Sequence, residues 1–176
     1  FTEYQDGDPQ TVLKQIAAIY AAIHEENLVY RSIPASYETV GQRITLADQI
    51  LETKLANCIE LSLLVASALE AVGIYSGIVI TKNHAFLSVW LDELCSQHGV
   101  LDDCSFIGKK CSEGISEMTV IECTELTKQT TSFEVAQEIA RNHLLDIDAF
   151  ERYNDNKRCR LEGIRPLPAR TKDGDK

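Results

Sequence analysis

The fold of this chain is decided by residues 57–69, which read NCIELSLLVASAL. Asn57 is a good helix cap, Glu60 three positions later completes a variant of the capping box, and Gly73 supplies a left-handed stop. The predicted helix, which runs to about residue 72, is apolar on nearly every side, so protein must surround it. Cys58 lies in its first turn, where unpaired N–H groups and the positive end of the helix dipole favour a thiolate.

Three strands are predicted to follow this helix. Residues 74–81 and 85–91 contain β-forming residues and are joined by a turn at 82–83, which is typical of two antiparallel strands. Four residues in and just before the second strand share one face: His84, Phe86, Ser88 and Trp90. Residues 119–124 are predicted to form the third strand, and Glu122 lies in its middle, where an unpaired carboxylate is costly.

Further helices are predicted on either side of this unit. Asp8-Pro9 and the apolar spacing that follows predict a helix over 9–26, and a shorter helix is predicted over 46–55. A capping box at 131–134 predicts another helix. The residues expected to face inward on the last two helices are Ile50, Leu51, Leu55, Val135, Ile139 and Leu144.

The remaining segments have weaker patterns. Residues 27–45 are expected to form loops or turns, and residues 92–117 an irregular excursion with one short helix or strand. From Tyr153 onward charges dominate, and two prolines disfavour regular structure. Together the patterns predict an α+β fold in which the buried helix that begins at Cys58 packs on an antiparallel sheet with flanking helices.

A chain of 176 residues suits a single domain. We expect this domain to cover 1–165, with its core at 41–126, and a tail or linker to occupy 166–176. The chain begins with Phe1 and contains one methionine, so we expect it to be part of a longer polypeptide.

Composition excludes several function classes. The net charge of −10 disfavours binding to nucleic acid, and no apolar run approaches the ~20 residues that a membrane span needs. Six cysteines are present, but no CxxC pair that would indicate a zinc site. We therefore expect reduced cysteines, a cytoplasmic location, and no metal; a cysteine-rich metal-binding domain is the less favoured interpretation.

Cys58, His84 and Glu122 form a candidate catalytic set. A single cysteine is most often a small buried hydrophobe, and a histidine at a strand start is most often exposed. The helix start gives Cys58 a specific reason to ionise, however, and a histidine partner would remove the cost of burying Glu122. The sequence thus suggests a thiol nucleophile, a base and an acid that orients the base.

The ordered motifs of the chain resemble those of the transglutaminase-like superfamily, a branch of the papain-like cysteine enzymes. The similar motifs are GQRI at 41–44, NCIE at 57–60, HAFLSVWL at 84–91 and VIECT at 120–124. The helix that starts near Phe133 and the ending GIRPLP at 163–168 are also similar. The resemblance is greatest to the domain of this type embedded in large bacterial multidomain proteins, so other domains of a parent polypeptide are expected neighbours.

This resemblance implies a role for each matching residue. Cys58 would be the nucleophile, His84 the base that activates it, and Glu122 the acid that orients the imidazole. Gln42 would supply an oxyanion donor or substrate contact, and Trp90 would line an acyl-binding channel. An exposed loop position for Gln42 and core packing for Trp90 are the simpler interpretations.

The third member of the set stays open at this level. Aspartate is usual there in the superfamily, and Asp102 and Asp103 follow the histidine in a similar segment. We prefer Glu122 because its strand can pair beside that of His84, whereas Asp102 and Asp103 lie in the irregular excursion and are most simply a solvated turn.

The resemblance implies a cysteine-dependent acyl-transfer enzyme that acts on amide bonds of protein or peptide substrates through a thioester on Cys58. Hydrolysis by a protease or deamidase is the expected net reaction, without metal or organic cofactor. The alternative is a catalytically silent transglutaminase-like module that serves as a scaffold or protein-interaction domain.

Overall fold

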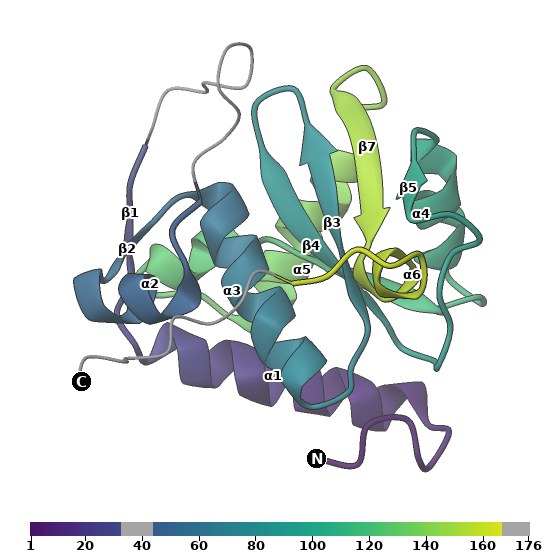
Figure 1. Ribbon diagram of the computed structural model, residues 1–176, viewed down its shortest axis with the longest axis horizontal. Helices are drawn as coiled ribbons and strands as arrows, with labels where there is room; N and C mark the ends of the chain where they lie inside the picture. Colours follow the sequence, from purple (N-terminus) through teal and green to yellow (C-terminus); the bar gives the residue numbers. More distant parts are fainter. Residues whose placement is uncertain (33–43, 167–176) are drawn as a thin grey trace.

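The computed structural model describes residues 1–32 and 44–166 (Figure 1). Its helices are α1 (Pro9–His24), α2 (Ala47–Thr53), α3 (Cys58–Ala71), α4 (Cys104–Lys110), α5 (Phe133–Leu144) and α6 (Asn156–Leu161), with a 3-10 helix at Cys123–Thr127. The strands are β1 (Val29–Tyr30), β2 (Leu55–Ala56), β3 (Ser76–Thr81), β4 (Ala85–Trp90), β5 (Val100–Leu101), β6 (Met118–Ile121) and β7 (Phe150–Asp155).

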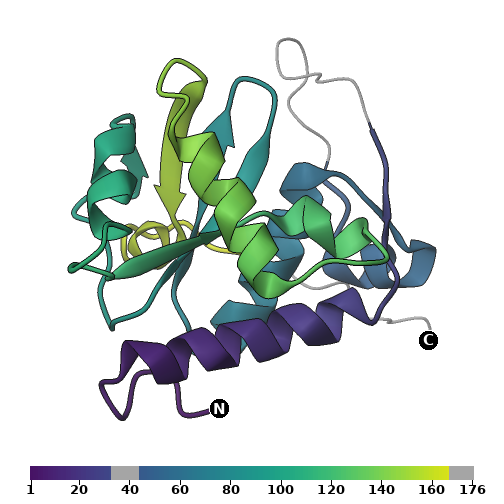
Figure 2. The ribbon, with the colours of Figure 1, turned by 180° about the vertical axis from the view of Figure 1, so that it is seen from behind.

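Five of the strands form an antiparallel sheet in the order β5-β7-β3-β4-β6, and β1 pairs with β2 in parallel. Helices cover both faces of the sheet. Helix α3 lies on one face with α1 beside it, and α5 and α4 lie on the other, as Figures 1 and 2 show from opposite sides. The predicted α+β class, with the helix of Cys58 packed on an antiparallel sheet, is confirmed.

Two hydrophobic clusters hold these layers together. Alternate residues of β4 belong to different clusters: Ala85, Leu87 and Val89 pack with α3 and α1, and Phe86 and Trp90 pack with α4, α5 and β7. Because β4 is covered on both sides, all six of its residues are buried. This central strand fixes the position of the turn that carries His84.

Helix α3 begins where the capping residues predict. The Asn57 side chain accepts a hydrogen bond from the Glu60 N–H, and the Glu60 carboxylate accepts one from the Asn57 N–H, so the capping box is complete. Gly73 follows with a positive φ of 78°, as expected for the stop. The start of the helix is therefore fixed by local hydrogen bonds as well as by packing.

Some inward faces were predicted wrongly. On α2, Ile50 is buried, but Leu51, which lies about 100° further around the helix axis, is exposed. The helix ends at Thr53, before Lys54 in a left-handed conformation. Leu55 lies in β2, where it pairs with Val29 of β1, and is also exposed. The prediction also placed Val135 inward on α5, but Val135 is exposed. Helix α5 begins after its cap, Ser132, and the residues that it buries against the sheet are Ala136, Gln137 and Ala140.

No strand or helix was predicted in the charged region that contains Tyr153, but the structure has β7 and α6 there. Strand β7 lies inside the sheet, hydrogen-bonded to β3 on one side and β5 on the other, and α6 follows it. The exposed Glu151 and Arg152 conceal the strand in the sequence, because burial falls on Tyr153 and Asp155 instead. Residue Pro166 is described, and the rest of the predicted tail lies outside the described residues.

Asp155 connects this strand to the rest of the core. It is fully buried, and its Oδ2 accepts hydrogen bonds from Trp90 Nε1 at 3.0 Å, the Ser96 N–H at 2.9 Å and the Tyr153 hydroxyl at 3.3 Å. Its Oδ1 accepts from the Arg158 N–H at 2.9 Å and caps α6. One carboxylate therefore joins the end of β4, the excursion after it, β7 and α6.

Replacement of Asp155 by alanine should lower the free energy of unfolding by about 3–5 kcal/mol, because it leaves several buried donors without an acceptor. Urea denaturation followed by circular dichroism measures this change. The exposed Asp148→Ala variant is the control and should change stability by less than about 0.5 kcal/mol. Equal stabilities for the two variants would contradict the role assigned to Asp155.

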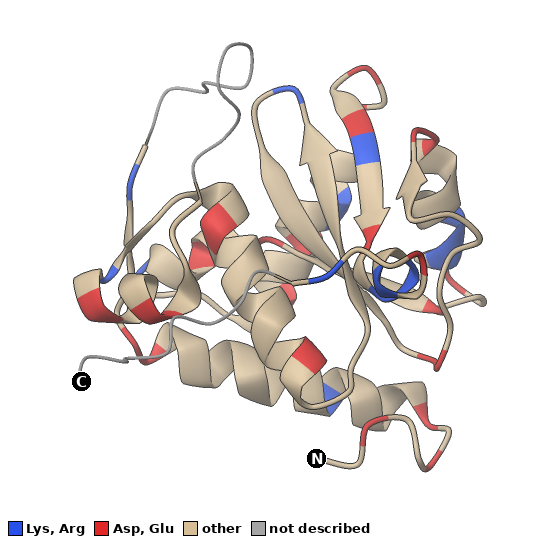
Figure 3. Ribbon diagram, viewed as in Figure 1, with Lys and Arg blue, Asp and Glu red and all other residues tan. Residues whose placement is uncertain are grey.

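Charged residues are distributed over many elements (Figure 3). Acidic residues occur on several helices and loops, and α6 carries a group of basic residues. Two of these basic residues form ion pairs, Arg158 with Glu162 at 3.0 Å and Arg160 with Glu70 at 2.9 Å. In residues 1–32 and 44–166, no helix has the length and hydropathy needed to cross a bilayer.

Candidate active site

Cys58 is the first residue of α3 and is half-buried. The turn before it is held by Glu60, whose side chain also accepts hydrogen bonds from the Thr45 N–H at 2.8 Å and from Arg31 at 3.3 Å. Glu60 is completely buried, so its carboxylate is shielded from solvent. The thiol therefore projects from a helix start that is rigidly held.

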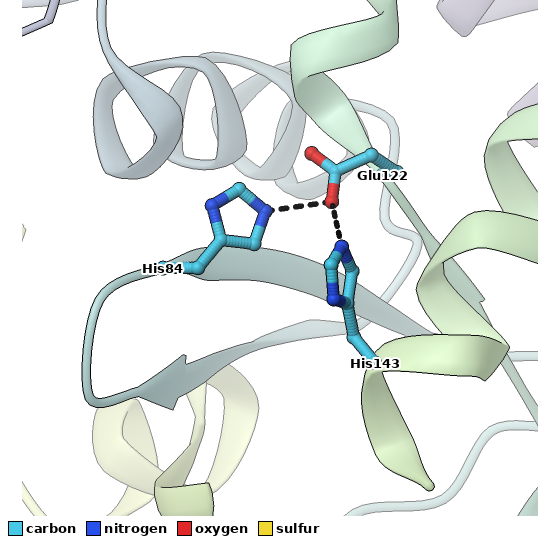
Figure 4. A group of neighbouring side chains, drawn as sticks. All are labelled: His84, Glu122 and His143. Carbon is cyan, nitrogen blue, oxygen red and sulfur yellow. Dashed lines mark hydrogen bonds and ion pairs between the residues drawn. The ribbon is translucent and has the colours of Figure 1, made fainter. Parts of the chain in front are cut away.

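His84 lies between the turn at 82–83 and the first residue of β4. Its carbonyl accepts a hydrogen bond from the Thr81 N–H at 2.8 Å, which fixes its backbone beside β3. Its side chain Nε2 lies 2.6 Å from Glu122 Oε2, as Figure 4 shows. Because Nε2 is occupied by the carboxylate, Nδ1 is the ring nitrogen available to Cys58, whose thiol contributes to raising the pKa of the imidazole.

Glu122 follows β6 directly and is not in the middle of a strand as predicted. Its backbone carbonyl accepts a hydrogen bond from the buried Tyr20 hydroxyl at 3.1 Å. Its Oε1 accepts from the N–H and hydroxyl of Thr124, at 2.9 and 2.7 Å, and so caps the 3-10 helix. Oε2 is left for His84. The carboxylate is nearly inaccessible to solvent, and both of its oxygens have partners.

The electrostatics of the three groups favour a thiolate and an imidazolium. Burial raises the pKa of Cys58, but hydrogen bonding to His84, the imidazolium charge and the N–H groups of Ala85 and Ile59 bring it below its usual value. Burial lowers the pKa of His84, but hydrogen bonds to Cys58 and Glu122 and their charges raise it to about 9. Despite burial, the pKa of Glu122 is lowered by its hydrogen bond with His84 and by the imidazolium charge.

The structure places the other candidate acids elsewhere. Asp102 and Asp103 follow β5, which forms the edge of the sheet opposite to β6 and lies about 14 Å from β4 at the usual strand spacing. The exposed Asp103 side chain caps α4 by accepting from the Ser105 N–H at 2.8 Å. Among the candidates of the sequence, Glu122 is the carboxylate that reaches His84.

The two predicted substrate contacts have different outcomes. Trp90 is buried at the far end of β4, in the cluster with α4 and β7, and its indole donates to Asp155. The structure does not bring it to His84, because six residues of extended strand separate them by about 20 Å; this residue serves core packing. Gln42 lies outside the described residues.

Sequence patterns missed two residues of the site. His143, near the end of α5, places its Nε2 3.3 Å from Glu122 Oε2, so two imidazoles face one carboxylate oxygen (Figure 4). Tyr30 lies on β1, which pairs with Ala56 of β2 and thereby comes next to the start of α3. Its hydroxyl lies beside Cys58, whose thiol contributes to raising the pKa of the tyrosine. Neither contact has a signal in the local sequence, because both depend on distant pairing.

The pKa of Tyr30 is raised by burial and by the neighbouring Cys58, so its hydroxyl stays protonated and can donate to the thiolate. Replacement of Tyr30 by phenylalanine should therefore raise the pKa of Cys58 and slow its alkylation at pH 6 by a few-fold. Iodoacetamide labelling followed by peptide mass spectrometry measures this. An unchanged rate would show that the hydroxyl does not stabilise the thiolate.

A family model matches residues 1–98, more than half of the chain, and its description is the transglutaminase-like superfamily. The chain belongs to the transglutaminase-like superfamily. The match contains Cys58 and His84, whereas Glu122 and His143 lie beyond it. The superfamily includes cysteine enzymes, and the mixed, antiparallel fold agrees with a papain-like architecture. No curated protein and no solved structure shows significant similarity to the chain.

Proposed function

We propose that this transglutaminase-like domain is a cysteine-dependent acyl-transfer enzyme that cleaves amide bonds of protein or peptide substrates through a thioester on Cys58. The observation that supports this proposal is the hydrogen bond of 2.6 Å between His84 Nε2 and Glu122 Oε2, which leaves Nδ1 available to a thiol at a helix start. This order of nucleophile, base and orienting acid is the arrangement that activates a thiol.

In the proposed reaction, His84 Nδ1 holds the proton of the Cys58 thiol. The thiolate attacks the amide carbonyl carbon, a C–S bond forms, and the carbonyl π electrons move to its oxygen. When the tetrahedral intermediate collapses, the C–N bond breaks and Nδ1 donates its proton to the leaving amine. Water then attacks the thioester carbon and gives a proton to Nδ1, and the C–S bond breaks, which releases the acid and restores the Cys58 thiolate beside protonated His84.

Several groups stabilise charge along this path. The hydrogen bond to Glu122 favours the imidazolium that exists between the two proton transfers. Backbone N–H groups at the start of α3 lie near the thiol. Such groups stabilise an oxyanion when they are within hydrogen-bonding distance of its oxygen. The Tyr30 hydroxyl provides a further donor beside the sulfur. Each of these stabilising groups is a side chain or a backbone N–H of this protein.

Acylation with p-nitrophenyl acetate tests the proposal without knowledge of the natural substrate. Intact mass measurement should detect one acetyl group, located on Cys58 and removed by hydroxylamine, followed by slow release into water. The products from peptides then distinguish the net reactions: new N-termini indicate a protease, ammonia a deamidase, and incorporation of an added amine a cross-linker. We propose hydrolysis, because it requires no site for a second substrate larger than water.

The second candidate is a transglutaminase-like scaffold without catalysis, supported by the glutamate where aspartate is usual. It predicts that p-nitrophenyl acetate labels Cys58 no faster than the other five cysteines, all of which lie in the described residues as free thiols. We favour the enzyme because Glu122 reaches His84 despite the substitution. A cytoplasmic location and attachment to other domains of a parent protein are further parts of the proposal.

A further inference from the structure

The second histidine at Glu122 has no part in the proposed reaction. His84 Nε2, His143 Nε2 and a Glu122 carboxylate oxygen all lie within 4.8 Å of one another. They come from the turn before β4, from α5 and from the end of β6, so three separate elements direct their donor atoms to one point (Figure 4). The aromatic ring of Phe86 lies 5.7 Å from that of His143 and packs beside it.

Two imidazole nitrogens and one carboxylate oxygen are a ligand set that suits Zn²⁺. A tetrahedral zinc ion with bonds of about 2.0–2.1 Å requires ligand atoms about 3.3 Å apart. The distance from His143 to Glu122 is already 3.3 Å, and that from His84 to Glu122, now 2.6 Å, must open slightly. Thr124 holds the other carboxylate oxygen, so Oε2 keeps its direction toward the two rings.

The cluster is also accessible. The side chain of His143 is 43% exposed, whereas that of Glu122 is 2% exposed. An ion can therefore enter from the side of α5 and keep a water molecule as its fourth ligand. Mg²⁺ and Ca²⁺ prefer oxygen ligands and should bind poorly to two imidazoles.

We propose that His84, Glu122 and His143 form a binding site for Zn²⁺ that inhibits the enzyme. The inhibitory consequence rests on the proposed function, whereas the binding site does not. Zinc takes the Nε2 lone pair of His84 and displaces its proton to solvent, so the remaining ring proton is on Nδ1. That ring can no longer alternate between accepting a proton from Cys58 and donating one to the leaving amine, and Glu122 is diverted to the metal.

Zinc titration of the full chain by calorimetry tests the site directly, with wild type, His143→Gln, Cys58→Ala and the exposed His98→Gln as the matched histidine control. Wild type, Cys58→Ala and His98→Gln should share one binding event. In His143→Gln its Kd should rise about tenfold or more, since a ligand is lost. Circular dichroism and urea midpoints verify that each variant is folded.

Two results of this titration would overturn the site. If Cys58→Ala loses the binding event, the ion is held by the thiolate; if His143→Gln binds as wild type does, the cluster is not the site.

Zinc should also reduce turnover of p-nitrophenyl acetate in wild type at concentrations near that Kd, and inhibition should require about tenfold more zinc in His143→Gln. Full turnover by zinc-saturated wild type would overturn the inhibition. Absence of turnover before zinc is added would instead refute the proposed function, while the calorimetry still decides the site.

Discussion

Replacement of Cys58 by alanine is expected to abolish acyl transfer, with a loss of about 10⁶-fold, the magnitude seen when a catalytic nucleophile is removed. The reason is chemical: without the sulfur no thioester forms, and His84 has no proton to accept. The variant should form no acetylated intermediate with p-nitrophenyl acetate, and it should hydrolyse this ester no faster than buffer alone does. Because Cys58 is only half-buried, the fold should persist.

Cys104 provides a matched control for this prediction. It is also the first residue of a helix, α4, and an aspartate side chain caps that helix. The structure pairs this thiol with no histidine within the described residues. Cys104→Ala should therefore retain full activity. Loss of activity in Cys104→Ala, or its retention in Cys58→Ala, would contradict the assignment of the nucleophile.

Replacement of Glu122 by glutamine is expected to lower the acyl-transfer rate by about 10³–10⁴-fold, as when the orienting acid of a triad is neutralised. The carboxylate raises the pKa of His84 and accepts the proton of its Nε2. An amide in its place stabilises the imidazolium less and permits the wrong tautomer. The pKa of His84 should fall, and with it the pH at which activity declines on the alkaline side.

The competing acids are the controls for Glu122. Asp102→Asn and Asp103→Asn should each leave the rate unchanged, because both residues are remote from His84, and asparagine can still cap α4. Steady-state kinetics with p-nitrophenyl acetate across pH 5–10 measures all three variants. A large loss in Asp102→Asn with little loss in Glu122→Gln would reverse the choice of the third residue.

Features that depend on neighbouring residues were predictable from the sequence. The cap of α3, its glycine stop and the hairpin of β3 and β4 all follow from short patterns, and the structure contains them. These features place Cys58 at a helix start and His84 at a strand start. The approach of the two residues was inferred from the family resemblance, and the pKa of Cys58, which His84 lowers, is consistent with it.

Features that depend on long-range pairing were not predictable. Glu122 was expected in mid-strand, since a run of β-forming residues continues past it, but Thr124 provides the hydrogen bonds that end β6 there. Strand β7 could not be recognised in the sequence, because Glu151 and Arg152 are charged and exposed although the strand lies inside the sheet. His143 contacts Glu122 only because α5 packs across β6, and no pattern near residue 143 indicates this.

The central claim is that Cys58 is a thiol activated by His84, and the pH dependence of its alkylation tests this most directly. Because the pKa of Cys58 is lowered, its thiolate forms as pH rises through a value below the ordinary one, while His84, with a pKa of about 9, is still protonated. Iodoacetamide should therefore label Cys58 with a midpoint well below about 8.5, the usual thiol value. In His84→Ala the midpoint should move upward. A midpoint near 8.5 in the wild-type chain, unchanged in His84→Ala, would contradict the account.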